Sequence, residues 1–314
     1  MLPETLFGYI RRYTGRHQLA LAALSVVVFA LSAVPLELQR RIVNDAIDKG
    51  SFEAILSLSI AYIGVALAEG GTKLALNIYR GWVSEGAVRH LRRLALHAES
   101  MQGGKGVELS MVLSEVEPVG GFIGAAVSEP LLQGGILLSI FGYMLYLQPG
   151  LALLSFLVFA PQIVFVPLMQ AAINRRVERR VLTLREVSSG IVQQAHADAF
   201  QHRRIDHVFA LQMGMYKLKF SMNFLMNLSH HVGVAGALAL GGWYVLEGRT
   251  ELGTVVAFIS GLAKLNDPWG DVVNWFRDMT VNRVKYRLLA AALRMPAPGD
   301  TPVSLERSGA ARAA

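Results

Sequence analysis

The 314-residue sequence contains no cysteine and few charged residues. Without cysteine it can hold no disulfide framework, no thiolate metal site and no thiol nucleophile. Only 17% of its residues are charged, against about 25% in soluble domains. By contrast, 53% of the residues are hydrophobic and the mean hydropathy is +0.40. This balance predicts a protein that is integral to a lipid bilayer.

Six apolar runs are long enough to cross a bilayer core, which needs roughly 20 helical residues. The segments 77–125 and 174–223 between them keep a helical pattern, so we expect long helical extensions into water. We therefore predict an all-α, six-helix transmembrane domain at 19–295. An interfacial segment at 1–18, with Arg and Tyr side chains, precedes it, and a flexible tail at 296–314 follows. The predicted spans are about 19–38, 52–76, 126–147, 151–173, 224–246 and 252–276.

The distribution of Lys and Arg predicts the orientation. Most of the 30 such residues lie near the two termini and in the two long loops, and the opposite side has only Arg40, Arg41, Lys49 and Arg249. Because cytoplasmic segments carry the excess of positive charge, we expect both termini and both long loops in the cytoplasm, with the protein in a bacterial inner membrane. The same residues raise the pI to about 9.8, so we expect no nucleic-acid partner.

The last apolar stretch carries charges within its predicted span. We expect one helix from Leu252 to about Leu289, in which Lys264, Asp267 and Asp271 share a face. Ionisable groups at this depth usually face a helix-bundle interior or a wet cavity. Two interpretations remain open: these groups bind a polar substrate, or Lys264 pairs with an aspartate at helical spacing. Trp269 beside them either stacks on a hydrophobic substrate or packs in the core.

Other polar and small residues in the spans predict contacts between helices. Glu69 and Lys73 are four residues apart and are expected to pair within one helix. Glu129 has no partner nearby in the sequence and is expected to bond to another helix. Two rows of small residues predict close helix packing rather than ligand contacts. These rows are Gly120, Gly124 and Ser128, and Gly233, Ala237 and Gly241.

Two stretches are similar to sequence patterns of a known family, and they occur in the same order along the chain and on the same six-span topology. GVELSMVLSEVE at Gly106–Glu117 is similar to a "GE…SR…D" pattern that returns from the first long loop. GRTELGTVVAFISGLAKLNDPWGDVVNWF at Gly248–Phe276 is similar to a pattern that enters the sixth helix, with Leu252-Gly253, Ala257-Phe258 and Pro268 in place. Together these stretches resemble the transmembrane domain of ATP-binding cassette (ABC) exporters.

The resemblance implies a transport subunit that forms its substrate pathway as a dimer, with a second copy or a related subunit. It also implies that the ends of the two long loops dock on an ATPase. The second loop is basic where the family is commonly acidic. The implied docking residues are His97, Glu99, Gln102 and Lys105 in the first loop, and Phe200, His202, Arg203 and Arg204 in the second.

The 314 residues contain no phosphate-binding loop of the form GxxxxGK[ST]. Lys105 follows Gly104, but Glu99 stands where the first glycine is required. We therefore expect no enzyme activity and no cofactor in this chain, with ATP and Mg²⁺ bound by a separate ATPase subunit. Two alternatives remain: a membrane scaffold or regulator without transport, and an ion-coupled carrier that uses Lys264, Asp267 and Asp271.

Overall fold

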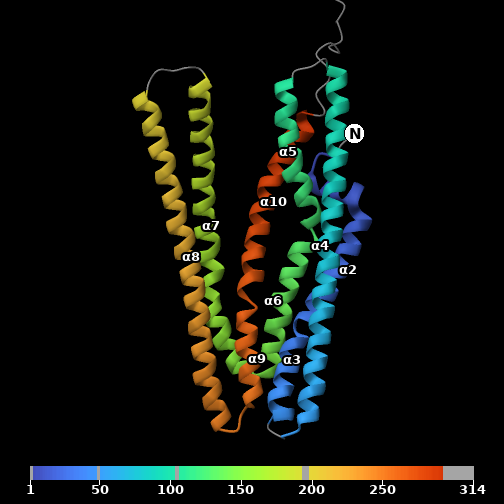
Figure 1. Cartoon of the computed structure of the whole chain (residues 1–314), viewed down its shortest axis with the longest axis vertical. Helices are drawn as coiled ribbons and strands as arrows, with labels where there is room; N and C mark the ends of the chain where they lie inside the picture. Colours follow the sequence, from blue (N-terminus) through green and yellow to red (C-terminus); the bar gives the residue numbers. More distant parts are fainter. Residues whose placement is uncertain (1–2, 48–49, 103–105, 193–197, 293–314) are drawn as a thin grey trace, which may run out of the picture. The chain divides into compact units, whose positions relative to one another are not determined.

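The computed structural model describes residues 3–47, 50–102, 106–192 and 198–292, and the regular elements in these ranges are helices (Figure 1). The all-α prediction is confirmed. The elements are α1 (Leu6–Tyr9), α2 (Gly15–Ser32), α3 (Val34–Arg41), α4 (Phe52–Gln102), α5 (Gly106–Ala125), α6 (Ser128–Leu147), α7 (Pro149–Val192), α8 (Asp198–Leu246), α9 (Leu252–Ala263) and α10 (Asn266–Ala292), with π-helical turns η1 (Ile10–Thr14) and η2 (Ile42–Ile47).

Five helical segments in the described part of the chain are long and apolar enough to cross a membrane, and they contain or closely match the first five predicted spans. The predicted extensions are also present. Helix α4 continues to Gln102, α7 to Val192, and α8 starts at Asp198, so these helices run well beyond the predicted spans. The predicted tail at 296–314 lies outside the described residues.

The sixth predicted span is not one helix. The expected helix from Leu252 to about Leu289 is divided at Lys264 and Leu265 into α9 and α10. Pro268 explains the division. It has no N–H to donate to the carbonyl of Lys264, and its ring clashes with that carbonyl in a continuous helix. The chain instead makes a tight turn, in which the backbone N–H of Leu265 donates to the carbonyl of Leu262 at 3.3 Å.

The chain divides into two compact units. The first comprises Met1–Ser25, Leu74–Glu129 and Trp275–Ala314, and the second comprises Val26–Lys73 and Pro130–Asn274. In the first unit the N-terminal helices, α4, α5 and the end of α10 share a core in which Tyr9, Ile123 and Tyr286 are fully buried. In the second unit, α7 and α8 lie side by side (Figure 1), and α9 packs on α3 and α8 around Phe258.

Close packing of α5 on α4 in the first unit uses the first predicted row of small residues. A Cβ at Gly120 would overlap Val88, and one at Gly124 would overlap the backbone carbonyl of Arg80. The other row lies in the second unit, where Gly233 and Gly241 of α8 contact the side chains of Leu262 and Val255 on α9. Both rows therefore let helices approach closely.

The contact at Gly124 gives a matched pair of variants. Gly124→Ala is expected to lower the free energy of unfolding by about 1–3 kcal/mol, because its methyl group meets rigid backbone. Gly121 lies on the same helix with open space around it, so Gly121→Ala should be neutral or slightly stabilising. Denaturant unfolding of both variants in detergent measures the difference. Equal stabilities would contradict the packing described here.

Candidate substrate pathway

Lys264 lies in the turn between α9 and α10, and its side chain reaches the break between α2 and α3 in the same unit. Helix α2 ends at Ser32, and Pro35 follows at the start of α3. The N–H of Leu36 bonds to the carbonyl of Ala33 at 3.1 Å. The Ser32 carbonyl accepts instead from the ammonium group of Lys264, at 3.2 Å. The last carbonyls of a helix carry partial negative charge, which favours a cation there.

Of the two interpretations that the sequence leaves open, the structure does not show the pair of Lys264 with an aspartate. In the described part of the chain Lys264 forms no ion pair with Asp267 or Asp271. The turn at 264–265 removes the continuous helical spacing on which that pairing depended. Lys264 holds α9 against the end of α2 instead.

Asp271 is bound from another helix of the same unit. The side-chain amide of Gln133 on α6 donates to Asp271 Oδ2 at 2.8 Å. Gln133 is buried, with 7% of its surface exposed. A buried amide that donates to a carboxylate stabilises its charge and fixes its orientation. No local spacing pointed to Gln133, which lies 138 residues from Asp271 in the sequence.

Asp267 differs from both neighbours because it is exposed. Within the described ranges it has no hydrogen-bond or ion-pair partner. It lies on the first turn of α10, inside the sixth predicted span. A carboxylate in this position is not stable against lipid. Within a bilayer such a carboxylate faces a bundle interior or a wet cavity.

Trp269 packs mainly as a core residue. Its ring contacts Phe159 of α7 edge-on, with centroids 6.0 Å apart. Its indole N–H is buried and has no hydrogen-bond partner among the described residues. Gln162, one turn after Phe159, has only 1% of its surface exposed, and its carbonyl oxygen is likewise unpartnered there. These two buried polar groups are available to hydrogen-bond a ligand or a water molecule.

Elsewhere in the spans, one predicted contact forms and another does not. Glu129 is paired across helices with Arg80 of α4, which confirms that prediction. Glu69 and Lys73 do not pair within the described chain, and Lys73 is exposed on α4. Helix α4 thus carries an exposed charge inside a predicted span.

Comparison with known families decides the identity. The model of the ABC transporter transmembrane region matches residues 19–196. The chain belongs to this family. A comparison with curated proteins gives no match.

An ABC transporter transmembrane region is not catalytic by itself, and it works with nucleotide-binding domains. Of the implied docking residues, His97, Glu99 and Gln102 belong to the last turns of α4, and Phe200 to Arg204 belong to the first turns of α8. Helix α4 ends three residues beyond Glu99, and α8 begins two residues before Phe200. Lys105, and the side chains of His97, Glu99, Gln102, Phe200 and His202, lie outside the described residues. Arg203 is exposed and Arg204 is half-buried.

Proposed function

We propose that the chain is the membrane subunit of an ATP-driven exporter in a bacterial inner membrane, with both termini in the cytoplasm. It forms the substrate pathway as a dimer, with a second copy or a related subunit. Its energy comes from a separately encoded ATPase, which binds ATP and Mg²⁺ and docks on the cytoplasmic ends of α4, α5, α7 and α8.

The observation that supports the proposal is the exposure of Asp267, in contrast to its two hydrogen-bonded charged neighbours. Lys264 and Asp271 are held by Ser32 and Gln133, whereas Asp267 is exposed within a predicted span. Charged groups in membrane spans face a bundle interior or a wet cavity and mark transport pathways. The exposed Lys73 on α4 supports the same conclusion, because it too requires water or a second subunit.

Docking of the ATPase is tested through the two arginines near the start of α8. Arg203→Glu with Arg204→Glu should reduce co-purification of the ATPase at least about ten-fold, because complementary charge selects partners across such an interface. Acidic-to-basic changes in the receiving groove of the ATPase should restore it. The matched control is Lys217→Glu with Lys219→Glu, which makes the same charge change on exposed positions about 20 Å further along α8.

The outcomes separate the proposal from its alternatives. Equal ATPase recovery with the reversed and native arginines would contradict the electrostatic docking. If cross-linking in native membranes captures no ATPase at all, the chain is a scaffold or regulator. Transport that persists without ATP would instead favour an ion-coupled carrier.

A further inference from the structure

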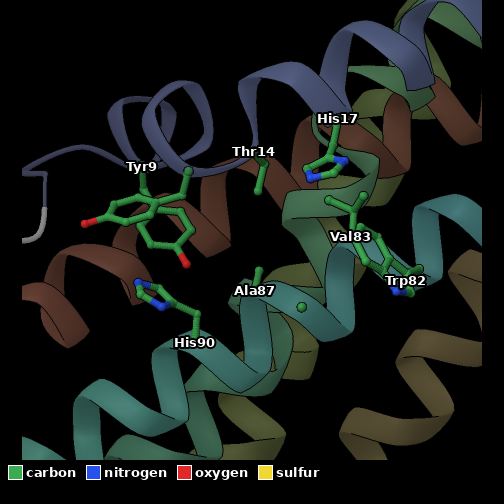
Figure 2. A pocket seen from close by; sticks show the side chains of 9 residues that line it. Tyr9, Thr14, His17, Trp82, Val83, Ala87 and His90 are labelled. Atoms are coloured by element: carbon green, nitrogen blue, oxygen red, sulfur yellow. The ribbon is translucent and has the colours of Figure 1, made fainter.

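The first unit contains a cavity of about 210 Å³ between the N-terminal helices and α4 (Figure 2). Tyr9 and His90 lie at one end of it and His17 and Trp82 at the other (Figure 2). Thr14 and Ala87 lie between the two ends. The cavity is separate from the substrate pathway described above, whose residues belong to the second unit.

The walls of the cavity are aromatic. At one end Tyr9 stacks on Tyr13 with ring centroids 4.8 Å apart, and Tyr13 contacts His90 at 4.9 Å. At the other end His17 meets Trp82 edge-on at 5.2 Å. The Nδ1 atom of His17 is hydrogen-bonded to the hydroxyl of Tyr79 at 2.7 Å, which fixes the imidazole. The two ends therefore present planar aromatic surfaces held in place by their neighbours.

The cavity also has free space beside Gly86 and contains a buried polar atom that forms no hydrogen bond with the described residues. Gly86 lines it, and a Cβ there would meet nothing within 4 Å. The Nε2 atom of His90 is buried and has no hydrogen-bond partner among the described residues. Space beside an unpartnered polar atom is the arrangement expected of a site that accepts a small polar group.

The positive charge around the cavity favours an anionic ligand. The N-terminal side carries Arg11, Arg12 and Arg16, and the guanidinium of Arg12 lies 5.9 Å from the ring centroid of Tyr13. Helix α4 adds Arg89, which is next to the lining residue His90 in the sequence, whereas Arg92 is already paired with Glu117 at 3.5 Å. The nearby acids in the sequence are Glu4 and Glu85. The arginines outnumber them, so a quaternary ammonium group is disfavoured here although aromatic rings can bind one.

The end of the cavity formed by His17 and Trp82 fits the level of lipid headgroups, and the end formed by Tyr9 and His90 lies further toward the water. The cavity residues of the N-terminal helices end at His17, just before the first predicted span, and those of α4 begin at Trp82, just after the second. Tyr, Trp and Arg gather at this level of a bilayer, and arginines there attract anionic lipids.

We propose that this cavity binds the headgroup of an anionic phospholipid, with the phosphate near Arg12 and Arg16 and the polar end of the headgroup between the aromatic walls toward His90. A lipid bound in this way links the N-terminal helices to α4. The proposal rests on insertion of the chain into a membrane and does not require the proposed transport activity.

The test measures lipid binding to the purified, delipidated protein by native mass spectrometry. Phosphatidylglycerol should bind its first site about ten-fold more tightly than phosphatidylcholine, and inorganic phosphate should not displace it. Gly86→Leu fills the cavity and should weaken phosphatidylglycerol binding about ten-fold. The matched control is Gly81→Leu, a position on the same helix that is also open but does not line the cavity.

A second pair of variants tests charge independently of shape. Arg12→Gln with Arg16→Gln should weaken phosphatidylglycerol binding about ten-fold or more. Arg283→Gln with Arg287→Gln, exposed on α10 in the same unit, should leave it unchanged. Equal binding of the two lipids, or equal effects of Gly86→Leu and Gly81→Leu, would overturn the proposal. Displacement by inorganic phosphate at equal concentration would assign the cavity to a soluble anion instead.

Discussion

Replacing Arg80 by methionine is expected to lower the free energy of unfolding by about 3–5 kcal/mol, because it removes the guanidinium group that neutralises the half-buried carboxylate of Glu129. Arg80 pairs with Glu129 across α4 and α6, and its Nε atom also donates to the hydroxyl of Ser128 at 2.9 Å. The two charged side chains are only 17% and 19% exposed. A charge that is largely removed from water and then loses its oppositely charged neighbour is far more costly than an exposed one.

Denaturant unfolding in detergent measures this effect. The double variant Arg80→Met with Glu129→Gln should recover much of the loss, because neither charge then remains buried. The control is Arg92→Met on the same helix, whose contact with Glu117 at 3.5 Å joins side chains that are 46% and 75% exposed. Such surface pairs contribute about 0–1 kcal/mol. If Arg80→Met costs no more than Arg92→Met, the pair is not the buried contact described here.

Replacing Lys264 by methionine is expected to cost about 1.5–3 kcal/mol, the usual contribution of a hydrogen bond to a charged group. Methionine nearly keeps the volume of the side chain but removes the donor to the Ser32 carbonyl at the end of α2. Stability should fall because the lost bond to the Ser32 carbonyl is not replaced. The N–H of Leu36, which would reach that carbonyl in a continuous helix, donates to the carbonyl of Ala33 instead.

The second residue of the test is Asp267, which is exposed and has no partner in the described part of the chain. Asp267→Asn alone should leave stability unchanged, and adding it to Lys264→Met should give no recovery. Unfolding of the two single variants and the double variant measures the coupling between the positions. Recovery in the double variant would show that Lys264 and Asp267 pair after all.

The sequence supported the helical class, the first five spans and the long extensions, because each depends on local length and hydropathy. It also indicated that Glu129 needs a partner on another helix, although not that the partner is Arg80. The pairing interpretation for Lys264 is not observed, for a local reason. Pro268 interrupts the helix between Lys264 and the aspartates, so the helical spacing that such a pair requires is lost.

Other features depend on contacts that no sequence window contains. Gln133 approaches Asp271 only after α6 and α10 have packed. The aromatic cavity joins residues 9–17 to residues 82–90, so its shape follows from the packing of α4 on the N-terminal helices. The pairing of Glu69 with Lys73 failed because helical spacing permits a pair without requiring one. The net gain from such an i,i+4 pair is only about 0.2–0.5 kcal/mol.

The most direct test of the proposed transport role is the accessibility of position 267 in membranes that contain the ATPase partner. Because the chain has no cysteine, Asp267→Cys introduces a single thiol, and Leu153→Cys at an exposed apolar position of α7 is the lipid-facing control. We expect a membrane-impermeant maleimide on the cytoplasmic side to label Cys at 267 without nucleotide, and to lose access when ATP and vanadate close that side. The control should stay unlabelled in both states. Labelling at 267 that is absent, or that does not change with nucleotide, would contradict an ATP-gated pathway through this position.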